Sequence, residues 1–168
     1  ACGADADVDF EQLIGSTVHF SLADGLLAEL GVGRSWTSLC IRCEQVRAEP
    51  DGLSTYELTL VPHLWLLGQR SNYRLFQHRS ATDIVKELLD EWKIPHRFEV
   101  ASGRYPSLEL RMQYGETDYD FFERLLQEAG ISFFFSEEDE PTLVLSDEPH
   151  AADPCQPVPF VDATDQVQ

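Results

Sequence analysis

The sequence predicts an α+β protein that is mainly β, with two helices carried by strand–helix units in the middle of the chain. Three observations predict this class. Alternating apolar residues and turn-forming runs fill the first third of the 168 residues. Two apolar stripes at helical spacing follow, at 82–92 and 117–129, and each comes after a segment typical of a strand. A hydrophobic content of 43% suits a globular chain of this length.

The first third of the chain is expected to be mostly β. A single turn at 10–15 leads into the first of three predicted strands, which cover 17–22, 36–46 and 55–61. The last two are expected to pair antiparallel through the turn-forming run at 49–52. The apolar segment at 26–30 is compatible with a strand or with a short turn. The apolar stretch at 62–68 is predicted to connect this β part to the strand–helix units.

The helix that organises the chain begins after Thr117. Thr117 and Asp120 have the spacing of a capping box, and Gly130 ends the helix. The apolar positions between them are Phe121, Phe122, Leu125, Leu126 and Ala129. Because full burial of a large apolar side chain contributes about 1.5 to 3 kcal/mol, this helix is expected to anchor a core.

Strands are expected on both sides of this helix. Leu110, Met112 and Tyr114 alternate with polar residues before it. The nearly continuous apolar run at 131–135 follows it and is typical of a strand buried on both faces. An acidic turn at 137–141 leads to the expected partner strand at 142–145.

The same pattern occurs once upstream, with a strand at 73–77 and a helix at 82–92. Moving residues 73–94 forward by 37 positions places Ser80 on Thr117 without a gap. Two explanations stay open, an internal duplication or two capped amphipathic helices that resemble each other. Either way, the middle of the chain holds two strand–helix units.

The chain is strongly acidic, with a formal net charge of -18 and a pI near 4.4. No Lys or Arg precedes Arg34 or follows Arg124, so both ends are acidic and the centre is nearly balanced. Nucleic-acid binding through phosphates needs clustered Lys and Arg, and we expect none. Solubility is the favoured role of the charge, with repulsion of a passing polyanion or steering of a basic partner as the alternatives. No apolar run could span a membrane, and the first residue, Ala1, leads us to expect a piece of a longer chain.

Four cysteines are few for a disulfide framework, so we expect folding in a reducing compartment. Cys40 and Cys43 form a CxxC motif, but positions i and i+3 of a regular strand face opposite sides. Cys2 and Cys155 lie at opposite ends of the chain. Two small buried side chains are therefore favoured over a redox or zinc site at this motif.

The remaining candidates for chemistry are weak. The histidines are scattered, at His19, His63, His78, His96 and His150. Asp118 and Asp120 could form a glycosidase dyad, but acids in a first helical turn more often serve the helix dipole. Trp65, with its leucine neighbours at 64, 66 and 67, could form a contact surface, although interior packing is favoured. We predict no catalytic, cofactor-binding or metal-binding residue and no cofactor, and hence no enzyme.

Several motifs together resemble a known family. They are PHLWLL at 62–67, YRLFQ at 73–77, QYGETDYDFFERLLQEAGI at 113–131 and TLVLSD at 142–147. In order and spacing, 10–150 is similar to the N-terminal hub region of VgrG proteins, the spike of the type VI secretion system. The sequence departs from the usual pattern at Ser38, where the family has a glycine.

The resemblance implies small β-barrels of the phage tail hub type. On this basis residues 1–68 form part of a first barrel, with its opening strands before Ala1. Residues 69–148 form a second, α+β hub domain with both strand–helix units, and 149–168 form a Pro-rich extended segment that leads back toward the rest of the hub. The spike needle of the family is not expected within these residues.

The resemblance also implies a mechanical function. The chain would be a structural hub fragment that adapts a trimeric spike to a hexameric Hcp tube and helps to deliver effectors. Its expected partners are two further copies, Hcp and baseplate components, with a PAAR tip protein and effectors bound through other regions. We expect no stable membrane insertion, and we expect a cytoplasmic location during assembly followed by secretion or injection. The alternatives are a late-control-type hub of a phage or tailocin, and an enzymatic effector domain.

Overall fold

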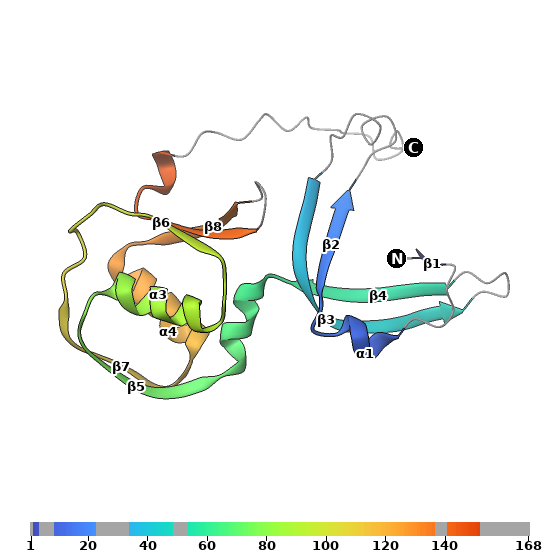
Figure 1. Cartoon of the computed structure of the whole chain (residues 1–168), viewed down its shortest axis with the longest axis horizontal. Helices are drawn as coiled ribbons and strands as arrows, with labels where there is room; N and C mark the ends of the chain where they lie inside the picture. Colours follow the sequence, from blue (N-terminus) through green and yellow to red (C-terminus); the bar gives the residue numbers. More distant parts are fainter. Residues whose placement is uncertain (1, 4–8, 23–33, 49–53, 137–140, 152–168) are drawn as a thin grey trace, which may run out of the picture.

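The computed structural model describes residues 2–3, 9–22, 34–48, 54–136 and 141–151. Two bodies lie at opposite ends of the long axis and are joined by a short connector (Figure 1). One is an antiparallel sheet, and the other holds two helices between two smaller sheets. The protein is thus mainly sheet with some helices, as predicted. No helix in the described part combines the length and apolar character that a bilayer crossing requires.

The first body is an antiparallel sheet with the strand order β1-β4-β3-β2. Its elements are β1 (Cys2–Gly3), α1 (Phe10–Leu13), β2 (Thr17–Leu22), β3 (Arg34–Ala48) and β4 (Ser54–Val61). The three strands predicted here are confirmed, and β3 and β4 pair antiparallel. Over the described residues the sheet stays open, because β1 and β2 each pair with one strand only. The predicted turn at 49–52 and the segment at 26–30 lie outside these residues.

A 3₁₀ helix, η1 (His63–Gln69), connects the two bodies. Leu64 and Leu67 are buried in the core of the second body. The apolar stretch therefore acts as the predicted connector, and it anchors the chain where the second body begins.

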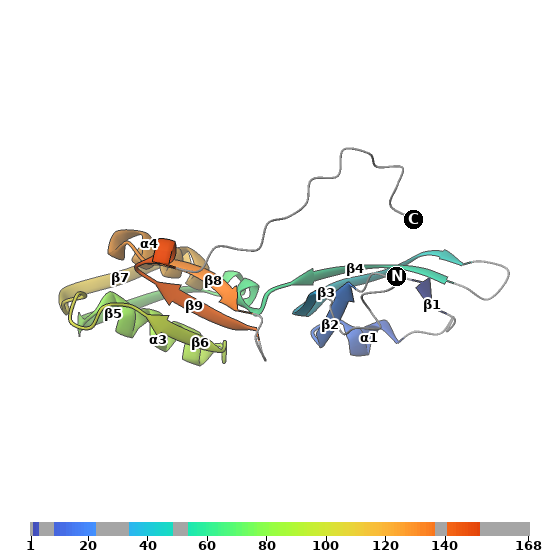
Figure 2. The same ribbon diagram turned by 90° about the horizontal axis from the view of Figure 1, so that it is seen from above.

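The second body has three layers, with both helices between a two-stranded and a three-stranded sheet (Figures 1 and 2). The two-stranded sheet pairs β5 with β7, and the other has the order β6-β9-β8. The elements are β5 (Ser71–Arg79), α3 (Ala81–Glu91), β6 (His96–Glu99), β7 (Leu108–Thr117), α4 (Asp118–Ala129), β8 (Ser132–Ser136), β9 (Thr142–Ser146) and η2 (Pro149–Ala151). Both predicted strand–helix units are present.

The core of the second body lies where α3 and α4 meet. Both predicted apolar stripes are buried, and they contribute Ile84, Val85, Leu88, Leu89, Phe121, Phe122, Leu125 and Leu126. Phe76 of β5 stacks on Phe121 with ring centroids 5.7 Å apart. The helical spacing alone located this core, because residues three and four positions apart share one face of a helix.

Both helices begin with the same cap. The Ser80 and Thr117 side chains accept hydrogen bonds from the amides of Asp83 and Asp120, at 3.1 and 3.0 Å. Each aspartate in turn accepts from the amide of its cap residue. This reciprocal capping box confirms the predicted starts of the two helices.

Both helices also end alike. Gly130 takes a left-handed φ of 67°, and Lys93, 37 positions earlier, takes a φ of 54°. The next residues, Ile94 and Ile131, each donate an amide hydrogen bond of 2.9 Å to a carbonyl five residues back. The matching ends show that the two units have the same local geometry from cap to cap.

The prediction that 131–135 is buried on both faces is wrong. β8 is an edge strand that pairs only with β9 in the described part, and Phe134 and Phe135 are 41% and 39% exposed. The strand buried on both faces is β9, where Leu143, Val144 and Leu145 are fully buried. A central strand is covered on both sides, whereas an edge strand is not.

No strand was predicted at β6, which follows α3. β6 pairs parallel with β9, so that His96 lies opposite Leu143. Its pattern is short and mixed, with His and Arg before Phe98, and strands of this kind carry little signal in sequence. The acidic turn at 137–140 and residues 152–168 lie outside the described residues.

Candidate functional site

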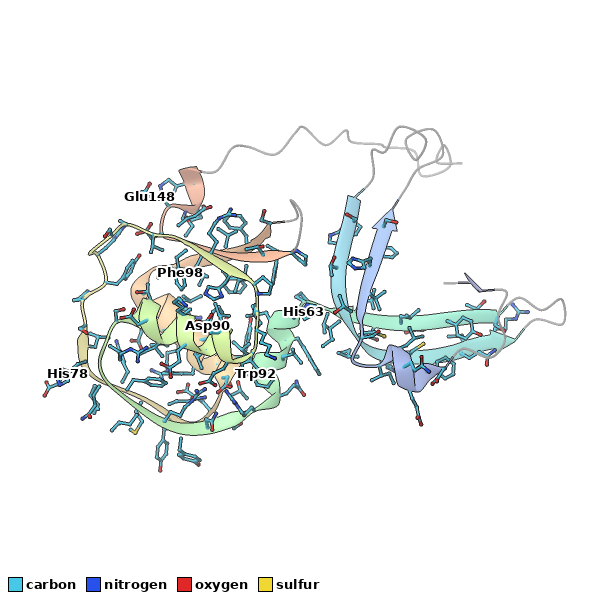
Figure 3. All side chains as sticks on the ribbon, in the orientation of Figure 1. His63, His78, Asp90, Trp92, Phe98 and Glu148 are labelled. Atoms are coloured by element: carbon cyan, nitrogen blue, oxygen red, sulfur yellow. The ribbon has the colours of Figure 1, made fainter. Side chains whose placement is uncertain are left out.

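The most elaborate polar cluster in the described part surrounds Asp118, whose side chain is fully buried. One carboxylate oxygen accepts from Gln113 Nε2 and Arg74 Nη2, each at 2.8 Å. The other accepts from Arg70 Nε at 2.8 Å and from Trp92 Nε1 at 2.9 Å. Trp92 lies at the end of α3 beside η1, as labelled in Figure 3. With a longer bond of 3.4 Å from Asn72 Nδ2, five side chains compensate the cost of burying one charge.

The cluster joins elements that are far apart in the sequence. Arg70 follows η1, Arg74 lies on β5, Gln113 lies on β7, Trp92 caps α3 and Asp118 is the first residue of α4. Glu91 completes the charge balance, because Arg74 Nη1 donates to it at 2.8 Å and Arg70 also pairs with it. Together with the amide of Gln113, two guanidinium groups and two carboxylates thus connect five elements.

The surroundings keep Asp118 ionised. Burial by itself raises the pKa of its carboxyl, but hydrogen bonds from Gln113, Trp92, Arg70 and Arg74 outweigh burial and lower the pKa from 3.8 to about 2. An ionised, fully bonded and inaccessible carboxylate is unsuited to proton transfer near neutral pH. The arrangement therefore serves to fix the elements around it.

The interpretation that Asp118 and Asp120 both serve the helix dipole holds for only one of them. Asp120 forms the capping box at the exposed start of α4. Asp118 turns into the core instead and binds two arginines. Sequence reasoning missed Arg70, Arg74 and the other donors, because spacing does not show which side of a strand faces inward.

The CxxC motif lies at an irregularity in β3. Cys40 lies opposite Leu60 and Cys43 opposite Leu58, with a register shift after Cys40. One extra residue reverses the alternation, so the two cysteines share a face, contrary to the prediction for a regular strand. Burial, and then the neighbouring Cys40, raise the pKa of the Cys43 thiol. Both cysteines are free thiols, and the absence of a redox or metal role stays a prediction.

Of the histidines described by the structure, His19 and His63 line one hollow, and the others are not part of its lining. His19 lies 2.9 Å from the Thr37 hydroxyl, and His96 Nδ1 lies 2.9 Å from a backbone carbonyl. His63 lies at the junction of the two bodies and His78 at the far end of β5 (Figure 3). Over the described ranges, no three His, Cys, Asp or Glu side chains are grouped so that they could hold a metal ion.

The expected interior packing of Trp65 is wrong, because its side chain is 39% exposed while Leu64 and Leu67 are buried. Trp65 lines an apolar surface hollow of about 490 Å³. The other residues of its lining are Pro62, Leu64, Gly68, Gln69, Tyr119, Phe133 and Phe135. On a 3₁₀ helix, consecutive side chains point in different directions, so one of four neighbouring apolar residues faces out.

The outer face of the β5–β7 sheet is also apolar. Tyr73 and Tyr114 are 73% and 72% exposed, and the next pair, Leu75 and Met112, is 56% and 47% exposed. The inner face carries Arg74 and Gln113 of the Asp118 cluster. In this sheet the apolar side chains therefore face solvent and the polar side chains face the helices, which is the reverse of the usual arrangement. An exposed apolar patch of this kind is typical of a protein contact surface.

The model of the phage tail baseplate hub (GPD) family matches residues 1–168. The chain belongs to this family. We refer to the chain below as the hub chain. The structure explains its motif at 113–131: Gln113 and Asp118 form the buried cluster, Asp120 caps the start of α4, and Gly130 ends the helix.

Two curated relatives are type VI secretion system spike proteins of Pseudomonas aeruginosa. VgrG4b is 44% identical over 96 residues, which are 55% of the hub chain and 12% of that protein. VgrG1a is 33% identical over 144 residues, which are 84% of the hub chain and 21% of that protein. The hub chain therefore spans at most about a fifth of the length of these relatives.

A solved structure shares the fold. The E. coli c3393 protein matches with a TM-score of 0.79 and 26% identity, over 91% of the hub chain and 42% of that chain. That protein is a component of the type VI secretion system and exhibits structural similarity to the T4 bacteriophage tail proteins gp27 and gp5. The resemblance found in the sequence is thereby confirmed.

Proposed function

We propose that the chain is the structural hub portion of a VgrG-type spike, in which it adapts a trimeric spike to the hexameric Hcp tube and helps to deliver effectors. The observation that carries this proposal is the match of the hub family along residues 1–168. The type VI spike relatives and the fold shared with c3393 support it.

The domain division follows from the same proposal. Residues 1–68 would form part of a first β-barrel, 69–148 the second hub domain and 149–168 an extended segment toward the rest of the hub. The open sheet of the first body supports a barrel. Its outer strands, β1 and β2, each have an unpaired edge in the described part, and further strands could pair there and close the sheet.

The role is structural rather than enzymatic. The Asp118 cluster supports this, since its carboxylate is buried and fully bonded. The proposed partners are two further copies of the chain, Hcp and baseplate proteins, with a PAAR tip protein and effectors held by other regions. Assembly would take place in the cytoplasm, before secretion or injection.

Deletion of the full-length gene and complementation in the source organism test the proposal. Hcp released into the medium is measured by immunoblotting. We expect release to fail in the deletion strain, to return with the wild-type gene and to fail again with Asp118→Ala, which destabilises the second body. The matched surface variant Lys86→Gln should restore release.

Hcp release that does not depend on the gene would contradict a type VI role. Loss of intact phage tails or tailocin particles in the same deletion strain would assign the hub to that machine instead. Turnover of peptidoglycan, lipid or nucleic acid by the purified chain, above a heat-inactivated control, would favour the enzymatic alternative.

A further inference from the structure

The two strand–helix units are related by a local two-fold axis through the β5–β7 sheet. Arg74 pairs with Gln113, and Phe76 pairs with Arg111. A half-turn about this axis places each residue of β5 on the residue of β7 that comes 37 positions later. Arg111 is therefore the equivalent of Arg74, and Gln113 is the equivalent of Phe76. The matching caps of α3 and α4 extend the same equivalence to both ends of the helices.

The charged groups follow this symmetry in part. Arg74 pairs with Glu91 at the end of α3, and Arg111 pairs with Glu128 at the same position of α4. The symmetry breaks at Asp118, the first residue of α4, because the first residue of α3 is Ala81.

It breaks a second time at Trp92, whose indole donates to the Asp118 carboxylate. The equivalent position, 37 residues later, holds Ala129. Two large groups that fill one half of the body, a carboxylate and an indole, are thus both replaced by a methyl group in the other half.

The space that these groups would fill is a solvent-open cavity of about 230 Å³. Its lining includes Ala81 and Ala129 at the two replaced positions, Arg111 and Glu128 of the repeated ion pair, and Arg104. An apolar cavity of about 150 Å³ is large enough for benzene, so this one can take a ring that bears a small polar group.

Arg111 makes fewer hydrogen bonds than its equivalent, Arg74. Arg74 donates to an amide oxygen of Gln113 and to two carboxylates. Arg111 pairs with Glu128 alone, and its Nε is the one buried side-chain nitrogen or oxygen in the described part that has no hydrogen-bond partner. Phe76 explains the unpartnered Nε, because it lies where the amide of Gln113 lies in the other half. This nitrogen is buried, so a ligand in the cavity would meet the terminal Nη groups of Arg111 instead.

We propose that this cavity, lined by Ala81, Arg111 and Ala129, binds an aromatic carboxylate. The carboxylate would pair with the guanidinium of Arg111, as Asp118 pairs with Arg74. The ring would lie over Ala129, where the other half places an indole. The ligand would thereby complete the symmetry of the two polar clusters.

NMR titration of the isotope-labelled 168-residue chain with indole-3-acetate tests the proposal, because this probe carries both missing groups. We expect amide shifts at residues 81, 111 and 129, with a Kd on the order of 1 mM or tighter. Indole-3-acetamide, which lacks the charge, should bind at least tenfold more weakly. A peptide ending in a free C-terminal Trp presents the same two groups. Tighter binding of the peptide indicates that the natural ligand is a protein terminus, and tighter binding of indole-3-acetate indicates that it is a small molecule.

Two substitutions place the missing groups in the cavity. Ala81→Asp restores the carboxylate and Ala129→Trp restores the indole, and each should abolish binding. Gln127→Glu adds the same charge on the exposed side of α4 and should leave binding unchanged. Circular dichroism verifies that each variant is folded, and either folded variant suffices for the test.

Three results would overturn the proposal. One is the absence of shifts around the cavity at about ten times the expected Kd. Another is equal binding of the acid and the amide, which would show that Arg111 does not recognise the charge. The third is unchanged binding by a folded Ala81→Asp or Ala129→Trp variant.

Discussion

Replacing Asp118 tests whether its buried cluster holds the second body together. In Asp118→Asn the side chain keeps its shape but loses the charge that two arginines share. The pKa of the carboxyl falls from 3.8 to about 2 on folding, and each pKa unit corresponds to about 1.4 kcal/mol. Since the side chain is fully buried, we expect Asp118→Asn to lose about 2 kcal/mol of unfolding free energy.

Asp118→Ala should cost more. It leaves Arg70, Arg74 and the Trp92 indole without their acceptor, and loss of one partner of a buried ion pair costs roughly 3 to 5 kcal/mol. A typical domain is stable by only about 5 to 15 kcal/mol, so this variant should be close to unfolding.

The assay is urea denaturation at neutral pH, followed by far-UV circular dichroism. With a urea dependence of about 1 to 3 kcal/mol per molar, Asp118→Asn should lower the midpoint by about 1 M. Asp120→Asn is the matched control, because Asp120 lies in the same turn but is exposed, and its loss should cost only about 0.5 to 1 kcal/mol. Equal losses at the two positions would refute the reasoning and leave Asp118 with a helix-dipole role only.

Three further predictions follow from the same structure. Because the pKa of Asp118 is lowered from 3.8 to about 2, its ionised form stabilises the fold fully above about pH 4.5 and progressively less toward pH 2. The stability difference between wild type and Asp118→Asn should therefore be constant from pH 7 to about 4.5 and shrink below it, as measured by urea titrations at each pH. Gly115→Ala and Gly130→Ala should each cost about 1 to 2 kcal/mol by thermal denaturation, because both glycines have a left-handed φ, of 64° and 67°. The tyrosine hydroxyl 2.9 Å from an added Cβ at Gly115 belongs to the exposed side chain of Tyr73, which can turn away, so a loss at Gly115 far above that at Gly130 would contradict this reasoning. Leu75→Gln and Met112→Gln should each change stability by less than about 0.5 kcal/mol, since both side chains lie on the exposed outer face, and a loss above about 1 kcal/mol would place this face in a core.

Local patterns in the sequence were sufficient for most elements. The capping boxes at Thr117 and Ser80 were visible in the residue order, because each involves groups within one helical turn. The apolar stripes likewise located the core. The three strands predicted in the first body agree with β2, β3 and β4 to within two residues at each end, whereas the two-residue β1 was not predicted. The motif at 113–131 was also sufficient to indicate the hub family.

Which face of a strand points inward was not available from the sequence. Leu75 and Met112 alternate with polar neighbours just as buried residues do, yet they face out while Arg74 and Gln113 face in. Alternation shows that a strand has two faces, and only the position of α3 and α4 shows which one is covered.

The sequence by itself determined the helices, their caps and the family, because these depend on residues close together in the chain or on their order. The tertiary structure alone decided that Asp118 meets Arg70 and Arg74, and that Ala81 leaves a cavity at the equivalent place. These contacts join residues more than forty positions apart or depend on the symmetry of a folded sheet, and no local spacing encodes them.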